Sequence, residues 1–242
     1  MIYIILGSVT GLLIGMVGIG GILLAPMLVY TTGIDLHLAM ATSSWSFLFA
    51  GIAGTMAYAR KGTISWNMVG WMCVGVMPGT ILGAKVNVSL PSEILTIILA
   101  VLILSSGIFA LVKKPPKKQD ESRVNRITLV FIGFAIGFGS ALTGTGGPVL
   151  LLPIFLLFSI PALVAIGVSQ AIQLPIAVFS SLGFVLYGEI DFILGALLGI
   201  VMAIGVVIGA QIAHRASAER LRQIVALALV AAGLLMILRV LI

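Results

Sequence analysis

Apolar residues occur along this chain in long stretches that are separated by short polar joints. The stretches cover residues 2–32, 38–59, 64–86, 93–112, 127–158, 162–187, 190–213 and 221–242. About 20 apolar residues in a helix cross a hydrocarbon core of roughly 30 Å. Backbone polar groups in lipid must also be satisfied within the spanning segment, which favours helices. The pattern therefore predicts an all-α, polytopic integral membrane protein folded as a helical bundle.

Composition agrees with this pattern and excludes several other classes. Of the 242 residues, 61% are apolar and 8% are charged, whereas soluble domains have about 45–50% and 25%. The single cysteine, Cys73, excludes a disulfide framework and a cysteine-based metal site. The excess of 13 Lys and Arg over 7 Asp and Glu bears on orientation in the bilayer rather than on nucleic-acid binding. Residues 1–5 carry no basic region, so we expect no cleaved signal peptide.

A charged, proline-containing linker near the centre divides the sequence into two halves. We expect a first membrane repeat over 1–113, a cytoplasmic linker over 114–125 and a second membrane repeat over 126–242. Shifting the sequence by 126 residues aligns 7–113 with 133–239 without a gap, with 20 identities in 107 pairs. Nine of these pairs are glycine on glycine, where composition alone predicts roughly 1.5. The two halves are therefore interpreted as an internal duplication.

The distribution of basic residues favours an inverted arrangement of these halves. If each half crosses the membrane an odd number of times, 11 basic residues lie on one side, and only Lys85 and Arg239 lie on the other. Eight plain spans would give a split of 9 to 4. Because cytoplasmic loops are enriched in Lys and Arg, we expect two inverted repeats, with three or five crossings each.

The first apolar segment of each half contains a glycine-rich interruption. Residues 2–32 would form a helix of about 45 Å, too long for one crossing and too short for two. Gly18-Ile19-Gly20-Gly21 lies in its middle, and Thr143-Gly144-Thr145-Gly146-Gly147-Pro148 lies at the matching place in the second half. Glycine leaves helical geometry readily, and proline starts a helix better than it continues one. We expect a broken or re-entrant first helix in each repeat.

Half-helices that begin inside the bilayer aim backbone N–H groups and a positive dipole end at its centre, which attracts anions. Buried hydroxyl and amide side chains nearby would add hydrogen-bond donors. The predicted substrate-binding residues are Gly18, Gly20, Gly21, Ser43, Ser44, Thr143, Gly144, Thr145, Gly146, Gly147, Ser169, Gln170 and Gln173. Two structural alternatives remain: glycines also serve close helix packing, favoured for Gly79 and Gly205, and hydroxyls also bond to carbonyls of their own helix.

Other polar and aromatic residues have structural interpretations. We expect Glu93 to stabilise a helix N-terminus, Lys85 to extend its stem along apolar surface, and Tyr58 and Tyr187 to anchor span ends at the headgroups. His37 and His214 are expected in loops without metal partners. No catalytic residue, metal site or cofactor is predicted.

The glycine-rich start, from Gly7 to Pro26, its recurrence from Gly133 to Pro153, and the short joints at Arg60-Lys61-Gly62 and Tyr187-Gly188 resemble the TauE/SafE family. The resemblance covers nearly the whole chain. It implies a transporter of sulfite, organosulfonates or related small organic anions in the bacterial plasma membrane.

The leading hypothesis is therefore a transmembrane transporter of small anions that binds its substrate near the bilayer midplane. Expected partners are the anionic substrate and membrane lipid, with no nucleic acid, and the oligomeric state stays open. Two alternatives are a channel-like or assembly-supporting membrane subunit and an intramembrane serine hydrolase that uses Ser43 or Ser169.

Overall fold

The structure is a computed structural model that describes residues 2–18, 20–112, 124–158 and 160–214, together with Val230, Leu234 and Leu238. Within these residues the chain is helical and has no strand. The elements are α1 (Ile2–Val17), η1 (Gly20–Leu23), α2 (Leu24–Thr32), α3 (Leu36–Ala59), α4 (Trp66–Ser89), α5 (Ser92–Val112), α6 (Arg126–Thr143), α7 (Pro148–Leu157), α8 (Ala162–Tyr187) and α9 (Phe192–Ala213).

Five of the described helices are long and apolar enough to cross a membrane, namely α3, α4, α6, α8 and α9. Shorter apolar helices cover Ile2–Met16, Gly20–Thr32 and Ser92–Ser105. Within the described residues, these findings confirm the prediction of an all-helical protein with several candidate membrane spans. The predicted segment 221–242 lies outside the described residues except at three positions, and linker residues 113–123 lie outside them entirely.

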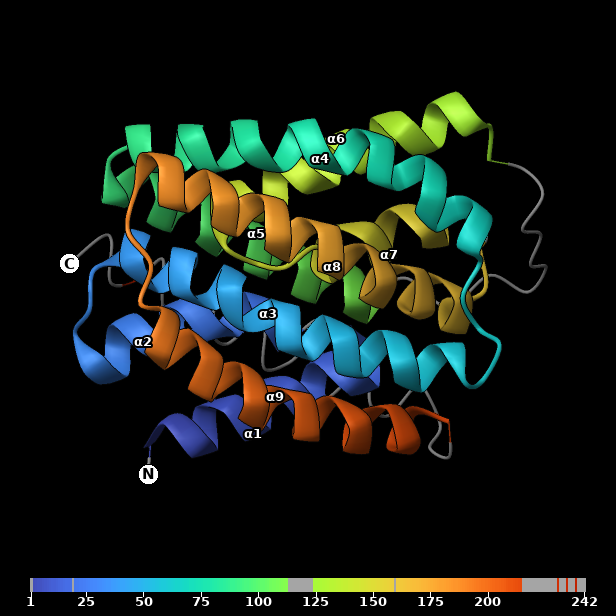
Figure 1. Cartoon of the computed structure of the whole chain (residues 1–242), viewed down its shortest axis with the longest axis horizontal. Coiled ribbons are helices and arrows are strands. Elements are labelled where there is room, and N and C mark those ends of the chain that lie inside the picture. Colours follow the sequence, from blue (N-terminus) through green and yellow to red (C-terminus); the bar gives the residue numbers. More distant parts are fainter. Residues whose placement is uncertain are drawn as a thin grey trace.

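Helix packing follows a regular scheme around two central helices. α3 packs against α8; α3 also packs against α9, and α8 also packs against α4. The outer pairs are α1 with α9 and α6 with α4. Figure 1 shows that α3 and α9 run in one direction along the long axis of the molecule, while α8 and α4 run in the opposite direction.

Glycines let the outer helix pairs approach closely. A Cβ atom added to Gly79 of α4 would collide with the carbonyl oxygen of Phe134 in α6. One added to Gly205 of α9 would collide with the carbonyl oxygen of Ser8 in α1, 2.9 Å away. These contacts confirm the helix-packing interpretation of the two glycines, because only a residue without a side chain fits there.

Two helices are interrupted at the glycine-rich motifs. α1 ends at Val17, and Gly18 has φ +77° before the short η1 and α2. α6 ends at Thr143, where Gly144 has φ +63°, and α7 begins at Pro148. In Figure 1 the N-terminus and the α2–α3 connection lie at the same end of the bundle, so this first segment turns back instead of passing through.

Two of the polar and aromatic residues, Tyr58 and His37, differ from expectation. Tyr58 is fully buried, and its hydroxyl donates to the carbonyl of Gly15 at 2.8 Å, so its prediction as a headgroup anchor was wrong. His37 lies in the first turn of α3, not in a loop. The ammonium of Lys85 lies 5.8 Å from the ring centre of Tyr187, which is 43% exposed. Glu93 lies in the first turn of α5, as predicted.

Candidate functional site

The two interruptions meet in the interior of the bundle. A Cβ atom built on Gly18 would lie 3.4 Å from Cβ of Pro148, the first residue of α7. A Cβ built on Gly21 would lie 2.7 Å from the carbonyl oxygen of Thr145. The start of η1 therefore faces the turn between α6 and α7, although the two motifs are far apart in sequence.

One face of α3 covers this junction. Met40 contacts the Cβ position of Gly144, and the ring of Phe47 contacts those of Gly21 and Gly146. Residues three and four apart share a helix face, so Ser43 lies on the same face between Met40 and Phe47. All three side chains are fully buried.

One face of α8 covers the junction from the other side. Ile166 contacts the Cβ position of Gly18, and Ile176 contacts that of Gly147. Ser169 and Gln173 lie between these two isoleucines on the same helix face, and the Ser169 hydroxyl oxygen is 3.8 Å from the Cβ position of Gly18. The contact of Ile166 with Gly18 corresponds, after a shift of 126 residues, to the contact of Met40 with Gly144.

Most of the predicted hydroxyl residues bond locally. Ser44 donates to Met40 O at 2.9 Å, Ser169 donates to Ile166 O at 2.8 Å, and Thr143 donates to Gly139 O at 2.7 Å. The hydroxyl oxygens of Thr145 and Thr143 lie 3.1 Å apart. Because Thr143 gives its hydrogen to Gly139 O, Thr145 is the donor of this second bond. Ser43 differs, because its buried hydroxyl has no hydrogen-bond partner among the described residues.

The two glutamines connect the central helices to their surroundings. Gln170 donates from Nε2 to Ile14 O of α1 at 3.1 Å, and Gln173 donates from Nε2 to Phe47 O of α3 at 3.2 Å. Their Oε1 atoms are buried and have no partner in the described part of the chain. An Oε1 atom only accepts hydrogen bonds, so water or a protonated ligand group could satisfy it, whereas an anion would need the second hydrogen of Nε2.

The backbone at the second interruption is only partly hydrogen-bonded. The carbonyl of Gly147 accepts the amides of Leu150 and Leu151 at 3.1 and 3.2 Å, and Thr145 N donates to Ser140 O at 3.2 Å. Among the described residues, the amides of Gly146 and Gly147 make no such bond. The second interruption therefore leaves these two N–H groups without a backbone acceptor.

Ser140 adds a polar group that the sequence analysis did not select. Its hydroxyl is buried without a partner in the described chain and lies 3.6 Å from the Cβ position of Gly147. Its counterpart 126 positions earlier is Ile14. A serine within an apolar helix usually bonds to its own carbonyls, so the sequence held no signal that separated Ser140 from other serines.

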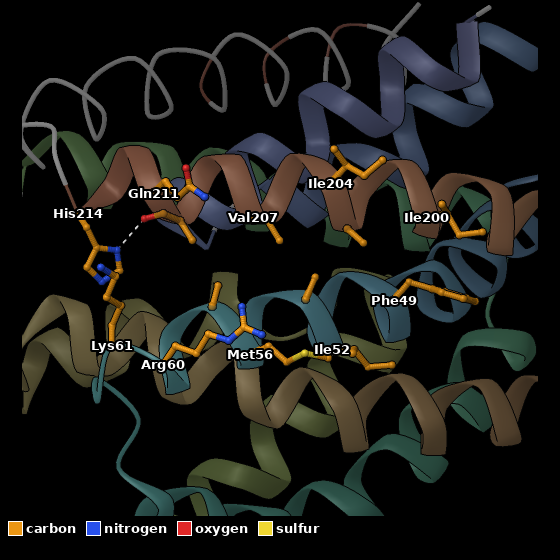
Figure 2. Close-up of a pocket in the computed structure, with 14 residues that line it drawn as sticks. Phe49, Ile52, Met56, Arg60, Lys61, Ile200, Ile204, Val207, Gln211 and His214 are labelled. Atoms are coloured by element: carbon orange, nitrogen blue, oxygen red, sulfur yellow. Dashed lines mark hydrogen bonds between the residues drawn. The ribbon is translucent and has the colours of Figure 1, made fainter.

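A groove lies on a different part of the molecule, between α3 and α9 (Figure 2). Its lining includes Phe49, Met56, Ile204 and His214, and none of the 13 predicted site residues. At the interruptions themselves, Phe47, Met40 and Ile176 pack closely against the glycines. The predicted glycines Gly18, Gly21, Gly144, Gly146 and Gly147 thus meet at one junction, whereas Gly20 faces Thr10 O of α1 and Gln170 lies against Gly54 of α3.

Comparisons with known proteins give a consistent result. The model of the family "Sulfite exporter TauE/SafE" matches residues 3–236, so the chain belongs to this family. The chain is 24% identical to "Probable membrane transporter protein YdhB" of Bacillus subtilis, over 98% of this chain and 100% of the relative. It is 25% identical to "Probable membrane transporter protein YjnA" of the same organism, over 97% of this chain and 98% of that relative.

A "Probable membrane transporter protein" of Xylella fastidiosa is 29% identical over 67% of this chain and 65% of its own length. No solved structure shows significant similarity to the chain. The family and these relatives make the chain a multi-pass protein of a membrane transporter family, and the family's description implies a small anion as substrate.

Proposed function

We propose that this TauE/SafE family member carries small oxyanions, such as sulfite, sulfonates or related organic anions, across the bacterial plasma membrane. The substrate would bind near the bilayer midplane, between the two helix interruptions. The observation that carries the proposal is the junction itself. Two non-helical turns face each other at Gly18 and Pro148, beside buried polar groups that lack partners. Non-helical backbone inside a membrane protein is tolerated where it is buried in protein or lines a cavity.

An architecture of two inverted repeats, 1–113 and 126–242, supports this mechanism. Each outer helix pair has a counterpart 126 residues away, as α1 with α9 corresponds to α6 with α4. The direction of α8 opposite to α3 in Figure 1 is consistent with inversion. In inverted-repeat transporters, substrate sites lie at the repeat interface and movement of one helix group against the other exposes them alternately.

The charge distribution supports an orientation with the linker in the cytoplasm. Arg60, Lys61 and His214 line one end of the same groove, so the α3–α4 connection and the end of α9 share a side of the bundle. Lys85 belongs to the opposite end, near the last turn of α4. Basic residues concentrate on the cytoplasmic side of membrane proteins, which places Arg60 and Lys61 there in the proposed topology.

At the site, each group has a chemical role in anion binding. The N–H groups of Gly146 and Gly147 and the hydroxyls of Ser43 and Ser140 would donate to substrate oxygens, in place of water. Gln170 and Gln173 would contribute the second hydrogens of their Nε2 atoms from α8, and Thr145 would turn its hydroxyl hydrogen from Thr143 to the substrate. Gly18 would let the ligand approach the backbone of the first interruption, whereas the Cβ positions of Gly20 and Gly21 lie against Thr10 O and Thr145 O, which favours close packing for these two.

The serine hydrolase alternative finds no support in the described residues. His37 bonds through Nδ1 to Asn87 Oδ1 at 3.2 Å, and His214 bonds through Nδ1 to Ala210 O at 2.6 Å. Neither bond involves Ser43 or Ser169, and a serine nucleophile needs an adjacent base. A channel-like subunit is distinguished from a carrier by flux that does not saturate.

The test is flux into proteoliposomes that contain the purified full chain, with sulfite, sulfoacetate and acetate as separate probes. A carrier gives saturable flux for at least one of them. Ser43→Ala removes the unpartnered hydroxyl, whereas Ser46→Ala removes one that already bonds to Thr42 O at 2.9 Å in the same helix. We expect the first substitution to lower flux at least tenfold and the second to leave it unchanged. Absence of flux for every probe, or equal effects of the two substitutions, contradicts the proposal.

A further inference from the structure

The groove between α3 and α9 combines an apolar channel with a basic end. Its volume is about 560 Å³. Figure 2 shows Ile52 and Met56 on α3 facing Ile204 and Val207 on α9, with Arg60, Lys61 and His214 together at one end. Met56 is 51% exposed and Ile204 is 61% exposed, so the channel opens on the outer surface of the bundle. That surface faces lipid in a membrane-spanning protein.

The groove lies beside a close contact between α3 and α9. A Cβ atom built on Gly199 of α9 would lie 2.5 Å from the ring of Phe49 in α3, so the two residues pack closely. Further along, Ala57 and Ala210 line the groove instead of closing it. At the corresponding place between α8 and α4, Gly183 replaces Ala57, and its Cβ position lies only 2.6 Å from Cβ of Ala84. The missing methyl group of Gly183 is one of the differences that allow a closer helix contact there.

The corresponding α8–α4 contact also lacks the basic end. The positions of Arg60, Lys61 and His214 are taken there by Leu186, Tyr187 and Val88. Ala53, which lines the groove, corresponds to the larger Phe179. The one basic residue, Lys85, lies over the ring of Tyr187 at 5.8 Å. The combination of an open channel and a cationic cluster thus belongs to one side of the bundle.

His214 contributes a buried polar atom to the basic end. Its Nδ1 donates to Ala210 O at 2.6 Å, and its Nε2 is buried without a partner in the described residues. The imidazole is held in place by this bond and by the ring of Tyr58, 5.3 Å away between centroids. With the hydrogen on Nδ1, Nε2 of the neutral imidazole is a fixed acceptor at the same end of the groove as Arg60 and Lys61. It can accept from a headgroup hydroxyl, and the two cations can meet the phosphate.

We propose that this groove binds an anionic glycerophospholipid, with its phosphate at Arg60 and Lys61, a headgroup hydroxyl at His214 and one acyl chain along the apolar channel. The 12 residues from Phe49 to Arg60 span about 17 Å in a helix, close to the roughly 15 Å of one leaflet's hydrocarbon. Basic pockets between membrane helices on the cytoplasmic side are suited to acidic headgroups. In the proposed topology, this end of the groove lies in the cytoplasmic leaflet. The site is separate from the transport junction.

The test is lipid retention by the purified full chain, measured by native mass spectrometry with phosphatidylglycerol and phosphatidylcholine as probes. Each basic side chain near an anionic headgroup contributes a factor of about five in affinity. The double variant Arg60→Gln/Lys61→Gln is therefore expected to bind phosphatidylglycerol roughly 30-fold more weakly. Its affinity for phosphatidylcholine stays the same. The control Lys85→Gln, at the corresponding contact, retains wild-type affinity.

A second variant tests the channel rather than the charges. Ala53→Phe introduces the residue found at position 179 and fills the groove. It is expected to reduce phosphatidylglycerol retention at least tenfold while the basic residues remain.

The proposal is overturned by wild-type phosphatidylglycerol affinity in the double variant, by equal losses in Lys85→Gln, or by equal affinity of the wild type for the two lipids. Another outcome concerns the C-terminal part of this chain. A cysteine placed at position 53 can be tested for cross-linking to single cysteines within 221–242. If a cross-link forms and phosphatidylglycerol does not change its yield, the groove is occupied by that segment and not by lipid.

Discussion

Gln173 donates a hydrogen bond from its side-chain amide to the backbone carbonyl of Phe47 at 3.2 Å, although 126 residues separate them. This separation equals the shift that aligns the two halves of the sequence. Equivalent positions of two structural repeats can touch only near the axis that relates them. The bond is therefore consistent with a pseudo-twofold axis between α3 and α8, beside the junction of the two interrupted helices.

The Gln173 side chain is expected to matter for transport more than for stability. Gln173→Leu removes the bond to Phe47 O and the unpartnered Oε1, at a cost of about 1 kcal/mol in unfolding free energy. We expect at least a tenfold loss of anion flux in proteoliposomes. Thr55→Val is the matched control, because Thr55 also bonds across from α3 to α8, at Gln170 O, 3.1 Å away. Equal flux losses in the two variants would show that Gln173 only joins α3 and α8 and has no separate role in transport.

Gly18 and Gly33 allow backbone strain to be separated from the function of the site. Both have left-handed φ, +77° and +72°, but Gly33 has open space around its Cβ position, while Gly18 faces Pro148. Alanine at either position should lower the free energy of unfolding by about 1–2 kcal/mol.

Only Gly18→Ala should also weaken anion binding, measured by the protection that sulfite gives against thermal unfolding. Undiminished protection in Gly18→Ala would remove the first interruption from the proposed site.

Tyr58 is expected to stabilise the end of α1. Tyr58→Phe leaves the carbonyl of Gly15 without its donor, which should lower unfolding free energy by about 1 kcal/mol. Its counterpart in the other half is Phe184, also buried, so the fold accommodates phenylalanine at such a position. Tyr187→Phe, at an exposed position, should not change the melting temperature. Identical melting temperatures for all three proteins would contradict the assigned role.

The proposed topology predicts which side of the membrane each polar joint occupies. In a Cys73→Ala background, single cysteines at Lys61 and Arg220 should both resist an impermeant maleimide in intact cells. A cysteine at Lys85 should react. These outcomes follow from an odd number of crossings per half, because eight plain spans would place Lys61 and Arg220 on opposite sides. Labelling of only one of those two positions would exclude inverted halves.

Spacing and composition alone predicted the helical elements well. The ends of α3 at Ala59 and α9 at Ala213 match the predicted apolar stretches, because charge and polar joints end a membrane span where the bilayer ends. The interruptions at Gly18 and Gly144 were predicted for a similarly local reason, since contiguous glycines beside a proline disfavour continued helix. The prediction for Tyr58 was wrong because a tyrosine near a span end usually faces the headgroups. Nothing in the local sequence shows that its hydroxyl bonds to a backbone carbonyl of another helix.

By itself, then, the sequence determined the membrane helices, their duplication and the positions of both interruptions, since these depend on local composition and periodicity. Only the tertiary structure decided which side chains meet. In it, Met40 contacts Gly144, Ile166 contacts Gly18, and the hydroxyls of Ser43 and Ser140 have no partner among the described residues. A groove lies beside Ala57 between α3 and α9, whereas Gly183 packs closely against Ala84 at the corresponding α8–α4 contact. Contacts between helices depend on the fit of side chains that lie far apart in the chain, and on differences as small as one methyl group.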